Sequence, residues 1–190
     1  MIVIDAKTAI ADCLENAFSL KEYMAIIEYV QQDSFEATPS FRKTYNGFYR
    51  VRQKSSDWYK KYYELMEKQR EDKKSFEEIL RALYAVGGCL DVSFASKLMA
   101  TVDPKLPIWD QYVIQNLGLK SQWEKMRSAD FESRIQVAVC IYQNLQEWYI
   151  NFTNSREGKA CIEEFDKALP KYKELLTDVK KVDYLLWSKR

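Results

Sequence analysis

One acidic and one basic side chain lie on either side of a proline-rich turn in the middle of the chain. Lys97 precedes the turn and Asp110 follows it, with Pro104 and Pro107 between them. Because proline stops a helix and favours an extended link, we expect Asp110 at the start of a new helix. A carboxylate there can accept backbone N–H bonds, remain ionised and activate a water molecule, while an amine can act as a nucleophile. The alternative is that Asp110 is only a helix N-cap, contributing about 1 kcal/mol.

The types of residue present restrict the chemistry further. The chain contains no histidine, which excludes Ser-His-Asp and Cys-His nucleophile systems and argues against zinc and non-haem iron sites. We therefore expect neither a metal nor a cofactor, and acid–base work must come from Asp, Glu, Lys, Tyr or Cys. The four cysteines, expected to be buried or half-buried thiols, are Cys13, Cys89, Cys140 and Cys161.

Positive charge gathers between residues 42 and 61, although the whole chain has a net charge of only +1. Seven cations and the single anion Asp57 lie in this stretch, a local charge of +6. Cations neutralise phosphates of nucleic acids, and aromatic rings stack on unpaired bases. The predicted DNA-binding cations, led by the two arginines after residue 49, are Arg50, Arg52, Lys54 and Arg42. The alternative is a solvated face over an aromatic core, in which Trp58, Tyr62 and Leu65 pack inside.

Apolar residues recur at helical spacing along most of the chain, which predicts an all-α, compact multi-helix fold. We expect one globular unit over residues 1–190, or two helical lobes with a cleft between them. Segment 34–54 is the least regular and holds a weak strand pattern at 48–52. Three Ser-x-x-Glu sequences read as capping boxes: Ser19/Glu22, Ser75/Glu78 and Ser121/Glu124. The expected helices are 5–17, 19–33, 55–71, 75–87, 93–102, 108–117, 121–127, 130–152, 157–169 and 172–188.

A short helical hairpin is expected around the glycine pair Gly87-Gly88. The first helix should end at these glycines, and the second should begin between Asp91 and Ser93. The N-terminus of the second helix favours an anion, and a DNA phosphate is one such anion. The alternative is an ordinary connection between two helices, without a ligand.

The sequence Ala95-Ser-Lys-Leu-Met99, followed by Pro107-Ile-Trp-Asp110-Gln-Tyr-Val113, resembles the reaction-centre segment of the helix-hairpin-helix DNA glycosylases, particularly the 8-oxoguanine glycosylase branch. The resemblance covers roughly residues 75–118. It implies the fold of that family, double-stranded DNA as partner, and a damaged or modified base rotated out of the duplex as substrate. It also implies that Asp110 assists attack at the sugar and that Ser93 and Trp109 contact DNA.

The same resemblance implies a Schiff-base role for a lysine in the hairpin. The family usually has a Gly-x-Gly turn followed closely by this lysine, whereas this chain has Leu90-Asp-Val-Ser93 there. Lys97 stands about one helical turn later, about 5.4 Å further along the axis. If Lys97 does not reach the sugar, hydrolysis by a water that Asp110 activates remains.

Two other functions fit the sequence. One is a catalytically inactive fold relative that binds DNA or protein, and the other is an unrelated helical interaction domain. The chain lacks an apolar run of about 20 residues and a secretory signal, so we expect no membrane partner and a cytoplasmic location. Aromatic residues near the C-terminus, expected to form core or a homodimer contact, are Trp148, Tyr149, Phe152, Phe165, Tyr172, Tyr184 and Trp187.

Overall fold

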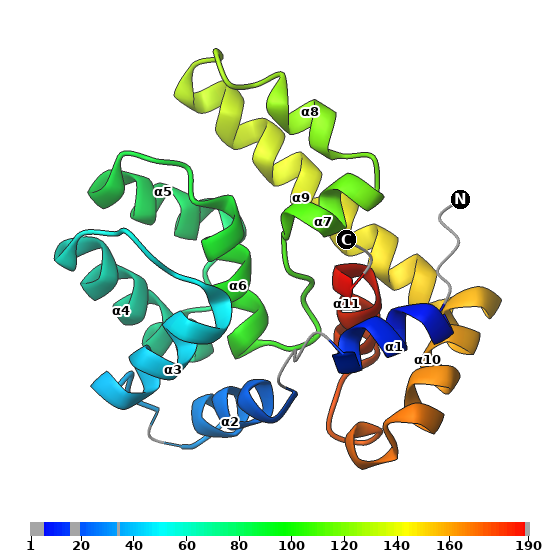
Figure 1. The fold of residues 1–190 in the computed structure, drawn as a ribbon. Coiled ribbons are helices and arrows are strands. Elements are labelled where there is room, and N and C mark those ends of the chain that lie inside the picture. The colour runs from blue at the N-terminus through cyan, green and yellow to red at the C-terminus, as the bar shows by residue number, and fades with distance from the viewer. Residues whose placement is uncertain (1–5, 16–19, 34, 189–190) are drawn as a thin grey trace. The chain divides into compact units, whose positions relative to one another are not determined.

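The computed structural model of the chain describes residues 6–15, 20–33 and 35–188. These residues form eleven α-helices and one short 3-10 helix, and none of them lies in a strand. The all-α prediction is therefore confirmed. The chain divides into two compact units (Figure 1), of which unit 1 holds Met1–Phe18 with Pro104–Arg190 and unit 2 holds Ser19–Asp103.

Unit 2 consists of α2 (Leu20–Val30), α3 (Pro39–Tyr49), α4 (Ser56–Asp72), α5 (Phe76–Gly87) and α6 (Val92–Val102). Helix α4 packs against α5 and α6, and α2 packs against α3 and α6. The expected helices 19–33, 55–71, 75–87 and 93–102 correspond to four of these five. Trp58, Tyr62 and Leu65 are buried, so their predicted place in the core is confirmed. Other fully buried side chains of this core are Tyr45, Met66, Ile79, Leu80, Leu83 and Leu98.

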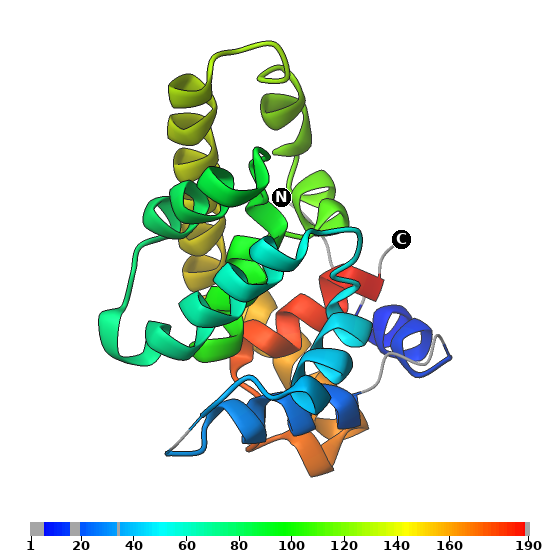
Figure 2. The same ribbon diagram turned by 90° about the vertical axis from the view of Figure 1, so that its left-hand side faces the viewer.

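Unit 1 is built around its C-terminal helix. It consists of α1 (Ala6–Glu15), α7 (Gln111–Asn116), α8 (Lys120–Glu124), α9 (Phe131–Asn154), α10 (Arg156–Ala168), η1 (Pro170–Tyr172) and α11 (Asp178–Ser188). Helix α11 contacts α1, α7, α9 and α10, and α9 turns back along α8 (Figure 2). The buried apolar side chains of α9, α10 and α11 include Ile135, Ala138, Ile141, Leu145, Phe165, Val182, Leu185 and Leu186.

The segment predicted to be irregular contains a complete helix, α3. Thr38 caps it, because its hydroxyl oxygen accepts the Phe41 N–H at 3.4 Å. Pro39 occupies the first turn, where its fixed φ suits a helix and its missing N–H costs nothing. Phe41 and Tyr45 are buried in unit 2, so packing further stabilises the helix. The weak strand pattern at 48–52 does not form a strand, because Asn46-Gly47 lies inside this helix instead of forming a turn.

The three predicted capping boxes have different outcomes. The box at Ser75 is confirmed: its Oγ accepts the Glu78 N–H at 3.2 Å, and the Glu78 carboxylate accepts the Ser75 N–H at 2.8 Å. The box at Ser121 is wrong, because Leu119 already has helical backbone angles and α8 begins at Lys120. Ser19, which opens the remaining box, lies outside the described residues.

Gly87 allows the end of α5 to approach Trp58 of α4, and we expect Gly87→Ala to destabilise the protein. An added Cβ would lie 2.7 Å from Cδ1 of the fully buried Trp58 ring, so the ring or the end of α5 would have to shift. The expected loss is about 1–3 kcal/mol in the free energy of unfolding, measured by urea denaturation. Gly47→Ala is the matched control in α3. Its Cβ would meet nothing within 4 Å, so this variant should gain up to about 1 kcal/mol.

Candidate functional site

Asp110 is the N-cap residue of α7, so it lies at a helix start, as its position after the proline turn predicted. Its Oδ1 accepts the N–H of Tyr112 at 2.8 Å, so the carboxylate caps the helix. The side chain is half-buried. The backbone before it is held in place within unit 1, because the Thr177 hydroxyl donates to the Pro104 carbonyl at 2.6 Å and the Tyr142 hydroxyl donates to the Pro107 carbonyl at 3.1 Å. The N-cap role is present whatever chemistry the group performs.

A buried polar network lies in unit 1, the unit that also contains Asp110. Lys180 of α11 donates from Nζ to Oδ2 of Asp183 at 2.6 Å, and the Tyr149 hydroxyl of α9 donates to the other oxygen of Asp183. All three side chains are buried. Desolvation raises the pKa of Asp183. The ammonium of Lys180 and the hydrogen bond from Tyr149 partly offset that rise, and the charge of Asp110 adds to it. Desolvation is also the largest cause that raises the pKa of the Tyr149 hydroxyl. The charges of Asp183 and Asp110 raise this pKa further.

This network was not predicted from the sequence. A signal for it was nevertheless present, because Lys180 and Asp183 stand three residues apart in α11, among the buried apolar residues Val182, Leu185 and Leu186. Opposite charges at that spacing face each other on a helix. Tyr149 is 34 residues away from Asp183 in the chain, so only the packing of α9 against α11 identifies it as the third member.

Lys97 is held by groups of unit 2. Its Nζ donates to the Tyr49 carbonyl at 3.1 Å and lies 5.4 Å from the ring centroid of Phe94. A carbonyl oxygen and the face of an aromatic ring both attract a cation, so these contacts favour the ammonium form over the neutral amine. Lys97 belongs to unit 2 and Asp110 to unit 1, and a pocket common to both remains a prediction.

The helical hairpin is present as predicted. Gly88, with a φ of +66°, closes α5, and α6 begins at Val92. Asp91 occupies the N-cap position of α6, but its side chain does not cap that helix. Instead its carboxylate accepts from Lys54 Nζ at 2.6 Å and from Trp58 Nε1 at 2.9 Å. Ser93 is half-buried in the first turn, and its carbonyl accepts the Ser96 hydroxyl at 2.9 Å.

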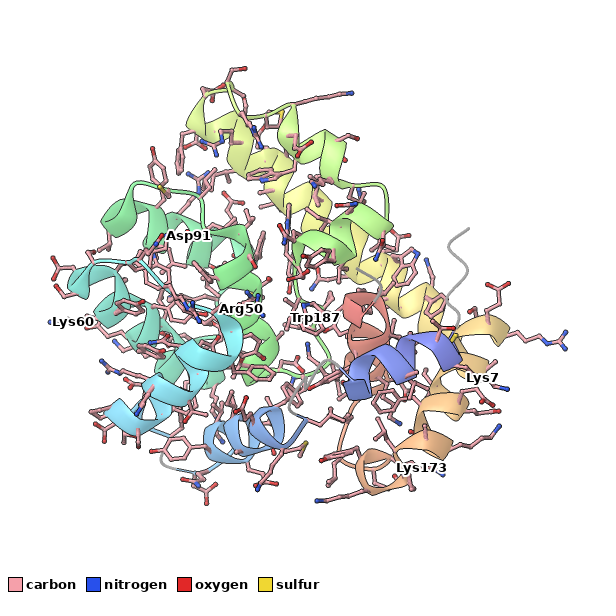
Figure 3. The ribbon with its side chains drawn as sticks, in the orientation of Figure 1. Lys7, Arg50, Lys60, Asp91, Lys173 and Trp187 are labelled. Carbon is pink, nitrogen blue, oxygen red and sulfur yellow. The ribbon has the colours of Figure 1, made fainter. Side chains whose placement is uncertain are left out.

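The predicted DNA-binding cations fall into two groups. Lys54 is mostly buried, since only 18% of its side chain is exposed, and its ion pair with Asp91 is internal to unit 2. Arg42 donates from Nε to the Ala37 carbonyl at 2.6 Å and covers the Tyr63 ring at 4.8 Å. Arg50 and Arg52 are exposed. Figure 3 labels Arg50, at the end of α3, and Lys60, which lies at the outer edge of unit 2.

Hydrogen bonds and two left-handed residues fix the backbone of the connection between α3 and α4. Arg50 has the left-handed φ of 53° and Gln53 has a φ of 60°. Val51 is 2% exposed, its N–H donates to the Asn46 carbonyl at 3.0 Å, and its carbonyl accepts the Tyr59 hydroxyl at 3.0 Å. The two exposed arginines therefore stand on either side of an anchored residue.

The aromatic residues of both units serve mainly as core. In unit 2 the Tyr45 and Tyr62 hydroxyls are 2.8 Å apart and both rings are fully buried. In unit 1 Trp109 is 2% exposed and packs edge-on against Trp123 at 5.5 Å. This burial disfavours a direct contact between the Trp109 ring and a base. The DNA contact of Trp109 remains a prediction.

The C-terminal aromatic residues also pack largely within unit 1. Tyr149, Phe165 and Tyr184 are buried, and Trp148 stacks on Phe152 with ring centroids 4.7 Å apart. These contacts favour the core alternative, and the homodimer remains a prediction. The prediction of buried or half-buried thiols is confirmed for Cys161, which is buried. It is wrong for Cys89 and Cys140, which are exposed. The side chain of Cys13 lies outside the described residues.

The described residues were also compared with the patterns of metal sites and of membrane-spanning helices. Within the described ranges, no group of three or more Cys, Asp or Glu side chains is placed to hold a metal ion. None of the helices described has both the length and the apolar character needed to cross a membrane. Comparison of the chain with protein-family models, curated proteins and solved structures found no match.

Proposed function

We propose that this protein binds double-stranded DNA through the connection between α3 and α4. The observation that carries the proposal is the pair of exposed arginines, Arg50 and Arg52, on either side of the buried Val51. A guanidinium group binds a phosphate with two parallel hydrogen bonds. The anchored backbone reduces the entropy lost when the arginines bind, since less of the chain must be ordered.

The start of α6 supports the same proposal. The carboxylate of Asp91 is directed to Lys54 and Trp58, and it does not cap the helix. The ion pair neutralises most of the repulsion that this carboxylate would exert on an approaching phosphate. The first-turn N–H groups of a helix are suited to bind an anion, and Ser93 lies in that turn.

For the chemical step we propose hydrolysis of an N-glycosidic bond, assisted by Asp110, in a nucleotide rotated out of the duplex. Asp110 takes a proton from water, the water oxygen bonds to the anomeric carbon, and the bond to the base breaks. The proton then passes to the departing base. The half-buried position of Asp110 and its bond to the Tyr112 N–H support this role, because they leave the second carboxylate oxygen for water.

A second candidate function is a DNA-binding module without catalysis. The packing of Lys97 favours it over any lyase mechanism, because a Schiff base requires a neutral amine that reaches the sugar. The contacts of Lys97 with the Tyr49 carbonyl and the Phe94 ring instead favour the cation. We therefore expect borohydride to trap no covalent complex with a lesion-containing duplex.

The double variant Arg50→Ala/Arg52→Ala should weaken binding to duplex DNA. Each phosphate contact on a duplex contributes about 0.9 to the slope of log K against log salt concentration. We therefore expect the slope to fall by about 1.8, measured by fluorescence anisotropy of a labelled duplex between 50 and 200 mM salt (roughly the range over which such contacts are resolved). The charge-matched control is Arg127→Ala/Arg156→Ala, which removes two exposed arginines of unit 1. Equal slopes for the two double variants would refute binding through the α3–α4 connection.

Asp110→Asn should abolish base release and leave duplex binding unchanged. The amide keeps an oxygen for the Tyr112 N–H, so α7 retains its cap, but it cannot take a proton from water. Release of free base from duplexes that contain oxidised or alkylated bases is measured by chromatography. Binding without release by the wild type would leave the inactive module, and undiminished release by Asp110→Asn would rule out this role for Asp110.

A further inference from the structure

We propose that α3 enters the major groove of duplex DNA with its solvent-exposed side, called here the outer face of α3. The inference rests on the DNA binding proposed above, and it adds a helix surface and a groove to the arginine pair of the α3–α4 connection. The exposed residues of the outer face are Ser40, Lys43, Thr44 and Gly47 of the helix and the C-cap residue Arg50 (Figure 3).

The outer face follows from the helical spacing of α3. Its residues recur at intervals of three and four, so they share one side of the helix. The opposite side carries Phe41, Tyr45 and Tyr49, which are buried in unit 2. These rings hold the helix against the core, and the outer face is therefore held toward solvent.

The charge of the outer face is complementary to a phosphate backbone. Residues 37–56 include no acidic residue, and Lys43 and Arg50 are exposed cations. The exposed sides of α2 and α4 in the same unit carry acidic residues, among them Glu28 and Glu71. A DNA duplex bears one negative charge for about every 1.7 Å of its axis. The outer face of α3 therefore meets less repulsion from a duplex than the exposed sides of α2 and α4 do.

Gly47 stands in the middle of the outer face, although the fold does not require a glycine there. Its φ is not in the left-handed region, and an added Cβ would meet nothing within 4 Å. A glycine inside a helix is less favourable than an alanine, so packing and backbone geometry do not explain this residue. Glycine also occurs where a ligand approaches the backbone closely, and a DNA groove would approach α3 at this position.

The dimensions favour the major groove over the minor groove. A helix with its side chains is about 10–12 Å across, which fits the major groove, about 12 Å wide, and not the minor groove, about 6 Å wide. Lys43 and Arg50 are seven residues apart, which is about 10.5 Å along the helix axis. Their long side chains can therefore reach phosphates on both walls of the groove, while Thr44 and Gly47 face the base edges.

Binding through the outer face is tested with Lys43→Ala in the full chain. The slope of log K against log salt concentration on a labelled duplex should fall by about 0.9, the value of one phosphate contact. The matched control is Lys159→Ala, which removes an exposed lysine of α10 in unit 1 and should keep the wild-type slope. A slope for Lys43→Ala equal to that of the wild type overturns the inference.

Close approach at Gly47 is tested with Gly47→Leu. The added side chain should weaken duplex binding by about tenfold, the size of one lost base-edge contact. It should not lower the urea midpoint, because its Cβ points into open space. Ala160→Leu adds the same bulk at an exposed position of α10 and should bind DNA as the wild type does. Undiminished binding by Gly47→Leu also overturns the inference.

The groove itself is identified with the wild-type protein and two altered duplexes. In the first, each cytosine carries a glucosylated hydroxymethyl group at C5, which fills the major groove and leaves the phosphates and the minor groove unchanged. The second is duplex RNA of the same sequence, whose major groove is too narrow for a helix. We expect binding at least about tenfold weaker to both. Equal affinity for the plain duplex and either altered one overturns groove entry and leaves phosphate binding by Arg50 and Arg52 standing. Binding to none of the three refutes the DNA-binding function and this inference with it.

Discussion

Lys180→Met is expected to lower the free energy of unfolding by about 3–5 kcal/mol near pH 8, because it leaves a buried carboxylate without its cation. The Lys180–Asp183 ion pair has side chains only 2% and 11% exposed, so water cannot replace the lysine. Urea denaturation followed by circular dichroism measures the loss. The matched control is Lys167→Met, which breaks the exposed ion pair of Lys167 and Glu164 at the same three-residue spacing, and it should cost less than about 1 kcal/mol.

The loss in Lys180→Met should depend on pH in a definite direction. Desolvation already raises the pKa of Asp183 in the folded protein, and Lys180 opposes that rise, so removing Lys180 raises the pKa further. The folded state then holds a proton at pH values where the unfolded chain, with an Asp pKa of about 3.9, has released it. Stability therefore falls as pH rises from that value through the folded pKa. The variant should be closer to wild type at pH 5 than at pH 8, and equal losses at both would contradict the buried-carboxylate explanation.

A double substitution separates the ion pair from the packing around it. Lys180→Met/Asp183→Leu removes both charges and keeps apolar volume, so it should recover most of the stability lost in Lys180→Met. The Tyr149 hydroxyl loses its acceptor in this variant. If it stays unpaired, the free energy of unfolding falls by about 1–3 kcal/mol. A double variant no more stable than Lys180→Met would show that the charges are not the origin of the effect.

Gly158→Ala should be among the most destabilising single substitutions in unit 1. Gly158 lies in the first turn of α10, where its N–H donates to the Ser155 hydroxyl oxygen at 2.9 Å, and Ser155 both ends α9 and caps α10. An added Cβ would lie 1.8 Å from the Phe152 carbonyl oxygen and 2.7 Å from its carbon. These atoms are backbone, so no side chain can move aside, and the corner between the two helices must open.

We expect this change to cost at least about 3 kcal/mol, the upper end of overpacking penalties. The measurement is the urea midpoint of the full-length protein, with Gly47→Ala as the control that adds the same methyl group in open space. A loss below about 0.5 kcal/mol for Gly158→Ala would contradict the close approach of α10 to the end of α9, since a surface substitution without steric conflict stays within that range.

Features decided within one or two turns of helix could be predicted from neighbouring residues. The capping box at Ser75, the glycine end of α5 at Gly88 and the N-cap at Asp110 all follow from side chains bonding to backbone a few residues away. Helix α3 shows the limit of such prediction. Segment 34–54 was expected to be the least regular, and no helix was predicted there. Thr38 and Pro39 begin the helix with residue types common at helix N-termini, and burial of Phe41 and Tyr45 outweighs the turn preference of Asn46-Gly47.

Partners distant in the chain could not be predicted. The sequence placed Arg50 and Arg52 first among the predicted DNA-binding cations, and both are exposed. It did not show that Lys54 binds Asp91 or that Arg42 covers Tyr63. Helix packing decides which cation forms an internal contact, because a long side chain binds the acceptor that the packing brings near. The same holds for Trp109, whose neighbour Asp110 was placed correctly while its own ring proved to be buried.

The sequence by itself determined the all-α fold class, the order of most helices and the position of one carboxylate at a helix start, because helical periodicity and capping act over short distances. Only the tertiary structure decided which charged groups are paired within the core, notably Lys180, Asp183 and Tyr149. Those pairings depend on desolvation, and a group loses its water only when helices far apart in the chain pack around it.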